Sequence, residues 1–149
     1  MRSQTPSFLP SDLTADSSAL AVLPRGCTFT EPDWRALAPH WYPVAFAREV
    51  TQMPYAARLL DERVVLYRIS DGSVVAARDI CYRRGVPLSL GHVEGDEIVC
   101  KYHGLRYDPT GRCTCIPAHP NGAISPRLRL DIYQARPNDA RDVRLPDSA

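Results

Sequence analysis

Short apolar runs separated by turn residues dominate the middle of the chain. The runs are residues 56–60, 63–69, 74–79, 97–99, 105–108, 112–116 and 128–133. Ser70-Asp71-Gly72-Ser73 and Pro109-Thr110-Gly111 are turn signals between neighbouring runs. No long stretch has the 3.6-residue periodicity of a helix. Runs of this length and spacing predict an all-β fold, a small antiparallel sandwich or barrel.

The two ends of the chain lack this pattern. Residues 1–33 are rich in Ser, Thr, Asp and Pro, and we expect a flexible lead that ends in one helical turn over 31–37, capped by Thr30. Residues 134–149 carry few apolar side chains among many Arg, Asp and Pro, which is typical of a disordered tail. The folded domain is therefore predicted over residues 34–133.

Composition restricts the function further. A chain of 149 residues with 44% hydrophobic content forms one domain with a modest core. A net charge of +1 and a pI of about 7.7 argue against nucleic-acid binding or an anionic membrane surface. The sequence has no apolar run of the roughly 20 residues that span a bilayer and no secretory signal pattern. Five clustered cysteines in a chain expected to be cytoplasmic favour metal binding over disulfides.

Two short cysteine-containing segments carry the candidate chemistry. They read C-Y-R at residues 81–83 and C-K-Y-H at residues 100–103, with 18 residues between the two cysteines, and Gly85 and Gly104 follow them. This arrangement resembles the signature of Rieske [2Fe–2S] domains, in which C-x-H is followed later by C-x-x-H. The segment W-Y-P-V at residues 41–44 likewise resembles the entry strand of Rieske-type ring hydroxylases.

The resemblance covers residues 34–133 and implies a function. In this family two Cys thiolates hold one iron and two His imidazoles hold the other. It therefore implies that Cys81, Cys100 and His103 bind a [2Fe–2S] cluster. The implied role is one-electron transfer from a reductase or ferredoxin to a mononuclear iron, within the oxygenase component of an aromatic-ring-hydroxylating or demethylating oxidoreductase. Partners would be that donor, an oxygenase catalytic chain and further copies of the chain. Nothing after Tyr133 resembles the catalytic domain, so we expect a truncated chain.

One residue departs from the family pattern. Arg83 stands where the signature has its first His, and a guanidinium has no lone pair to give a metal. Three outcomes remain open. Water or hydroxide completes that iron, or another side chain such as His92 or Cys113 replaces the missing ligand, or the domain folds without a cluster.

Two alternative interpretations follow from the same residues. The first is a degenerate, cluster-free β domain without redox activity. The second is a structural zinc site, in which Cys81, Cys100 and His103 are joined by Cys113 or Cys115 in a Cys₃His tetrahedron. On the Rieske interpretation, Cys113 and Cys115 are packing residues.

Overall fold

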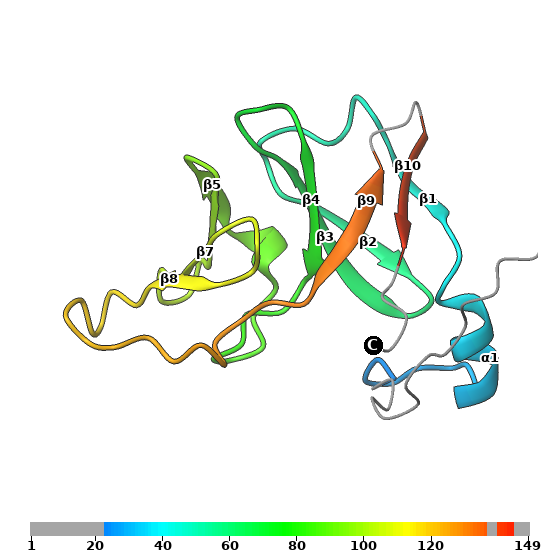
Figure 1. Ribbon diagram of the computed structural model, residues 1–149, viewed down its shortest axis with the longest axis horizontal. Helices are drawn as coiled ribbons and strands as arrows, with labels where there is room; N and C mark the ends of the chain where they lie inside the picture. Colours follow the sequence, from blue (N-terminus) through cyan, green and yellow to red (C-terminus); the bar gives the residue numbers. More distant parts are fainter. Residues whose placement is uncertain (1–22, 137–139, 145–149) are drawn as a thin grey trace, which may run out of the picture.

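Two antiparallel β-sheets form the framework of the protein (Figure 1), which confirms the predicted all-β fold. The structure, a computed structural model, describes residues 23–136 and 140–144, with side chains only as far as residue 136. One sheet has six strands in the order β1-β10-β9-β4-β3-β2, and the other has four in the order β5-β6-β7-β8. The elements are α1 (Glu31–Leu37), β1 (Tyr42–Phe46), β2 (Tyr55–Leu59), β3 (Glu62–Arg68), β4 (Val74–Arg78), the 3₁₀ turn η1 (Leu88–Leu90), β5 (His92–Glu94), β6 (Glu97–Val99), β7 (Arg106–Tyr107), β8 (Cys113–Cys115), β9 (Ile132–Arg136) and β10 (Ala140–Arg144).

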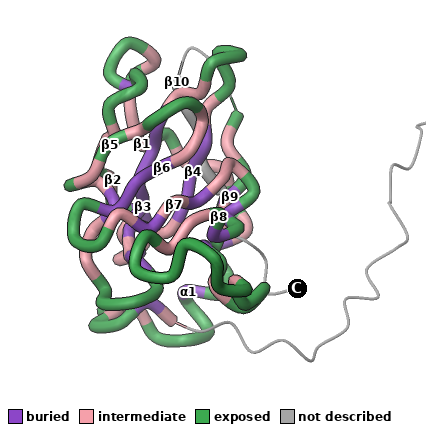
Figure 2. The backbone as a smooth tube through the Cα atoms, turned by 90° about the vertical axis from the view of Figure 1, so that its left-hand side faces the viewer, coloured by how far each residue is buried: buried purple, intermediate pink, exposed green. Residues whose placement is uncertain are grey.

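The β3–β4 hairpin lies between the two hydrophobic cores of the molecule. Alternate side chains of β3 point to opposite faces, as the pleat of a strand requires. Val65 and Tyr67 enter the core shared with the smaller sheet, whereas Val64 and Leu66 enter a second core. All four side chains are fully buried, and Figure 2 shows this central buried region. The predicted hairpin turn is confirmed, with Gly72 at φ +88°.

The smaller sheet carries the second cysteine-containing segment in the connection between its middle strands, β6 and β7. Its strands β6, β7 and β8 confirm the runs predicted over 97–99, 105–108 and 112–116, with shorter ends. β5 was not predicted, because its single apolar residue, Val93, lies between two exposed ones. The turn between β7 and β8 contains Gly111 at φ +85°, where an added Cβ would lie 2.5 Å from the carbonyl oxygen of Leu130. Only glycine fits this position without a shift of the backbone.

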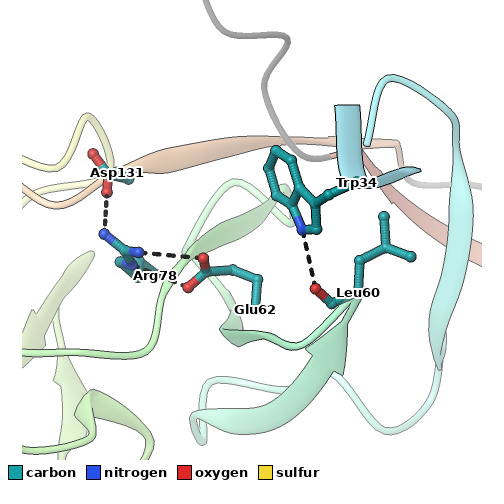
Figure 3. Close-up of polar contacts among 5 residues, drawn as sticks. All are labelled: Trp34, Leu60, Glu62, Arg78 and Asp131. Carbon is teal, nitrogen blue, oxygen red and sulfur yellow. Dashed lines mark hydrogen bonds and ion pairs between the residues drawn. The ribbon is translucent and has the colours of Figure 1, made fainter. Parts of the chain in front are cut away.

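The N-terminal helix belongs to the folded domain. Thr30 caps α1 by accepting a hydrogen bond from the backbone of Asp33, as predicted. Trp34 is only 5% exposed and packs in the second core, and its indole N–H donates to the carbonyl of Leu60 at 3.1 Å (Figure 3). The helix thus extends across the boundary that was expected after residue 33. Residues 1–22 of the expected lead lie outside the described residues. The helices of the described ranges include none long and apolar enough to cross a membrane.

The C-terminal segment contains two strands where a disordered tail was expected. β9 continues to Arg136, three residues beyond the predicted end of the strand. β10 then pairs with β9 on one side and with β1 on the other, which places it inside the larger sheet. The expectation of disorder from residue 134 is thus wrong for residues 134–136 and 140–144. Residues 137–139 and 145–149 lie outside the described residues.

An ion-pair network holds β9 against the hairpin. Arg78 of β4 donates to Glu62 of β3 at 3.0 Å and to the carboxylate of Asp131 at 3.2 Å (Figure 3). Its backbone N–H also donates to the Asp131 carbonyl at 2.9 Å. Glu62 is buried, so its charge needs the guanidinium as a partner. The network connects the last strands to the centre of the larger sheet.

Candidate metal centre

The two cysteine-containing segments form loops of the same backbone design. We call residues 81–85 the first loop and residues 100–104 the second loop. In each, the Cys N–H donates to the carbonyl of the residue after the Gly, at 2.8 Å in both, and the Gly N–H donates back to the Cys carbonyl, at 2.9 and 3.0 Å. Gly85 and Gly104 have φ of +69° and +68°, a left-handed conformation that glycine adopts without steric cost. Both loops are closed by backbone bonds alone.

Two thiols meet beneath these loops. Cys81 and Cys100 are each 2% exposed, belong to the same core cluster and interact through their side chains. Burial raises the pKa of the Cys100 thiol, and the backbone N–H groups of Tyr102 and His103, which donate to its sulfur, oppose that rise. The Cys81 sulfur lies 3.4 Å from the hydroxyl of Tyr107. A pair of buried sulfurs that already receives N–H donors is suited to holding a metal as thiolates.

The remaining side chains of the two loops are exposed. His103 lies at the surface with its ring centroid 4.0 Å from that of Tyr102, and Tyr102 is itself 60% exposed. Arg83 and Arg84 of the first loop are also exposed. The sequence-predicted residues are thus divided, with two sulfurs inside the core and one imidazole at the surface above them.

A cavity of about 350 Å³ adjoins the first loop. Tyr82 and Arg83 of the loop line it together with His119 and three apolar side chains, Leu105, Ile116 and Leu128. No role for His119 could be predicted, because nothing in its local sequence relates it to a position more than thirty residues earlier.

The structure does not bring the expected substitute ligands to Arg83. His92 lies on β5, with a 59% exposed side chain and its Nε2 3.9 Å from a Glu94 oxygen, and it lines a separate cavity beside Val50 and Met53. The Cys113 thiol donates to the carbonyl of Cys115 at 3.6 Å, and burial raises its pKa. Cys113 is a packing residue of the shared core.

The zinc interpretation is not supported by this arrangement. Zinc in a structural site needs four donors around one ion. Within residues 23–136, no three side chains of His, Cys, Asp or Glu are grouped to hold a single metal ion. A Rieske cluster makes a different demand, because its thiolates and imidazoles bind separate irons in pairs. The adjacent sulfurs of Cys81 and Cys100 meet that demand for one iron.

Comparison with known proteins identifies the domain. The family model of the Rieske [2Fe-2S] domain matches residues 40–134, which include both loops and most of the two sheets. The chain belongs to the Rieske [2Fe–2S] domain family. This Rieske domain is also similar in sequence to oxygenase components, as the family resemblance implied.

Two relatives illustrate the similarity. Methylxanthine N1-demethylase NdmA of Pseudomonas putida is 38% identical over 99 residues, which cover 62% of this chain and 28% of that protein. The oxygenase component of dicamba O-demethylase from Stenotrophomonas maltophilia is 38% identical over 100 residues, which cover 67% of this chain and 29% of that protein. The chain therefore matches less than a third of the length of these relatives.

Solved structures agree in fold. The structure of NdmA from Pseudomonas putida CBB5 superposes with a TM-score of 0.73 at 33% identity, covering 78% of this chain and 37% of that one. The crystal structure of dicamba monooxygenase gives a TM-score of 0.70 at 35% identity, covering 74% and 35%. The two-sheet architecture and its loops are thus those of a Rieske domain.

Proposed function

We propose that this chain is a Rieske electron-transfer domain of an oxygenase component, and that Cys81, Cys100 and His103 are three of its cluster ligands. The observation that carries the proposal is the pair of adjacent buried thiols at the base of two matching loops, one of which presents an exposed imidazole. When bound, a [2Fe–2S] cluster supplies one-electron transfer at the elevated potential that imidazole ligation produces.

The chain's own residues provide three contributions to such a site. Burial of Cys81 and Cys100 keeps water from the sulfurs. The backbone N–H groups of Tyr102 and His103 stabilise negative charge on the Cys100 sulfur, which favours the thiolate that a metal requires. The exposure of His103 leaves its imidazole where another protein can contact it.

Arg83 is the residue that limits the proposal. It occupies the position at which the family signature has a His, and its permanent positive charge cannot ligate iron. Among the side chains described, it has no ion-pair partner. This residue favours a second candidate, a cluster-free β domain without redox activity. The buried and well-packed thiols would allow the core to persist in that state.

The electron donor and the destination of the electron lie outside this domain. We propose a reductase or ferredoxin as donor and a mononuclear iron site of an oxygenase as acceptor. Support comes from the dicamba O-demethylase relative, which is named as an oxygenase component, and from a further match to a protein named oxidoreductase NdmD of Pseudomonas putida, 34% identical over 98 residues. That match covers 64% of this chain and 17% of NdmD.

Spectroscopy of the reconstituted protein tests the proposal. The chain is purified anaerobically, incubated with ferrous iron and sulfide, and analysed for iron, acid-labile sulfide and the electron paramagnetic resonance of the reduced form. The Rieske proposal requires about two irons and two sulfides per chain, as in a [2Fe–2S] centre, with a reversible redox couple. A chain that takes up neither iron nor sulfide is the cluster-free domain.

Substitution of Arg83 isolates the contribution of that position. If residue 83 leaves the cluster one ligand short, Arg83→His should slow iron loss to a chelator by at least about tenfold, since changes even beyond the direct ligands alter metal affinity by 10–100-fold. Arg84→His is the matched control, because it makes the same change of charge one residue further along the same exposed loop. Equal retention in Arg83→His and the parent would show that ligand loss at residue 83 is not the defect.

A further inference from the structure

A third loop, residues 116–122, lies against both cysteine loops. An added Cβ at Gly104 of the second loop would lie 3.2 Å from the ring of Pro117, so the Pro117 ring packs close to the backbone of that loop. Two residues later, His119 lines the same cavity as Tyr82 and Arg83 of the first loop. Two turns shape the segment, from the His119 N–H to the Ile116 carbonyl at 2.8 Å and from the Gly122 N–H to the His119 carbonyl at 3.0 Å.

Only one histidine besides His103 lies near the first loop. The chain has four histidines, and all are within the described residues. His40 follows α1, where its N–H donates to the Leu37 carbonyl, and His92 lines a different cavity on β5. Among the cavities formed by described residues, the one that Arg83 lines is also lined by His119, whose side chain is exposed.

The ligand chemistry of the family site gives a reason to consider His119 as a ligand. The second iron of a Rieske cluster is held by two imidazoles, and the two cysteine loops of this chain provide only His103. A neutral imidazole on the third loop is the donor type that the missing position requires. Arg83 is exposed and has no ion-pair partner among the side chains described, so no described salt bridge holds its guanidinium in the cavity.

We infer that His119 supplies the second imidazole, so that the ligand set is Cys81, Cys100, His103 and His119. This inference rests on the proposed function, because it assigns a ligand to the same cluster. It replaces His92 and Cys113, the residues nearest in sequence, with a residue that the fold brings to the cavity wall. The two-sulfur, two-nitrogen ligation of the family is thereby preserved with the nitrogen drawn from a different loop.

Four variants of the full chain, reconstituted as above, test the inference: His119→Ala, His92→Ala, Arg83→His and the double variant Arg83→His/His119→Ala. Removal of His119 is expected to speed iron loss to a chelator by at least about tenfold, whereas removal of His92, a similarly exposed histidine, leaves the rate unchanged. The double variant is expected to retain iron as well as Arg83→His, because a His at position 83 makes His119 dispensable.

A spectroscopic readout separates ligation from a structural effect. With ¹⁵N-labelled histidine, pulsed electron paramagnetic resonance of the reduced protein is expected to detect two coordinated nitrogens in the parent and one in His119→Ala. Circular dichroism checks that both remain folded, as expected for an exposed side chain.

The outcomes distinguish this inference from the proposed function. A parent chain that holds a cluster with equal stability and the same two nitrogens after His119→Ala overturns the inference alone. If the double variant loses iron as fast as His119→Ala, the inference is also overturned, since His119 would then act through folding or packing. A parent that takes up no iron and sulfide, while Arg83→His does, overturns both.

Discussion

Arg83 changes the chemistry of the first loop without changing its backbone. The loop is closed by bonds from the Cys81 and Gly85 N–H groups to carbonyls, and residues 82–84 are exposed. The second loop, which does carry its histidine, has the same closure and nearly the same Gly φ. Because no side chain of residues 82–84 takes part in the closure, the loop tolerates an arginine there at little cost in folding free energy.

The two kinds of buried thiol are expected to respond differently to substitution. Cys100→Ser should abolish cluster binding, because a serine hydroxyl is a poor substitute for a thiolate and Cys100 lies beside Cys81. Cys113→Ser should leave the iron content unchanged, since Cys113 bonds to a backbone carbonyl on β8. Iron and sulfide analysis of both reconstituted variants checks this. Equal loss of iron in the two variants would show that Cys113 has been misassigned as a packing residue.

The position of the second loop depends on a close approach between two backbone segments, one at Gly91 and the other at the end of β6. Gly91 lies between η1 and β5, and an added Cβ would lie 1.9 Å from the carbonyl oxygen of Val99. Val99 ends β6 and directly precedes Cys100. The clashing atom belongs to the backbone of a paired strand, so it cannot rotate away. The spacing between these two segments therefore depends on the absence of a side chain at residue 91.

Gly91→Ala should accordingly disturb both stability and the site. We expect a loss of about 3 kcal/mol or more in the free energy of unfolding, from overpacking of a strand that cannot yield. Iron retention should fall as well, because Val99 carries the displacement to Cys100. Gly95→Ala is the control. Its φ is +63° but nothing lies within 4 Å of an added Cβ, so about 1 kcal/mol is expected. Denaturant unfolding measures both, and equal losses would contradict the clash.

Hairpins could be predicted from the sequence, whereas the C-terminal strands could not. The β3–β4 turn has its own local signal in Gly72 and its neighbours, so its strands were predicted nearly to the residue. β10 lacks an apolar alternation, and it pairs with the preceding strand β9 and with β1, about a hundred positions earlier. The pairing with so remote a partner leaves little trace in the residues of β10 itself.

Tyrosine side chains are buried on both faces of the larger sheet. Tyr67 lies in the core shared with the smaller sheet, and Tyr133 lies in the second core. Burial raises the pKa of Tyr67 above its ordinary value of 10.0, and the carboxylates of Asp108, Asp96 and Glu97 raise it further. Burial likewise raises the pKa of Tyr133. Both phenols stay protonated in the folded chain at a pH where they ionise in the unfolded chain.

These raised pKa values predict a loss of stability in alkali. Below about pH 9 the phenols are protonated in both states, so they contribute no pH dependence. Above pH 10 the unfolded chain releases protons that the folded chain keeps, and the free energy of unfolding falls by up to about 1.4 kcal/mol per pH unit for each phenol. Tyr67→Phe should reduce that slope, whereas Tyr82→Phe, at an exposed position, should not. Urea unfolding between pH 8 and 11 checks this.

The Tyr67→Phe variant also defines the result that would contradict this prediction. Within the part of the chain that the structure describes, the buried Tyr67 hydroxyl has no hydrogen-bond partner, so its removal should cost little stability at neutral pH. An alkaline slope unchanged in Tyr67→Phe would mean that this phenol ionises equally in the folded and unfolded chains. The buried position of the Tyr67 side chain between the two sheets would then be incorrect.

The sequence by itself determined the local features of the site: the two cysteine segments, the glycines that follow them, and a cation where a ligand was expected. These depend on backbone turns and on the chemistry of single side chains, which neighbouring residues specify. Only the tertiary structure brought Cys81 and Cys100 together, paired β10 with β1, and placed His119 and Arg83 on the same cavity. Such contacts join residues far apart in the chain, so they are decided by how the sheets pack.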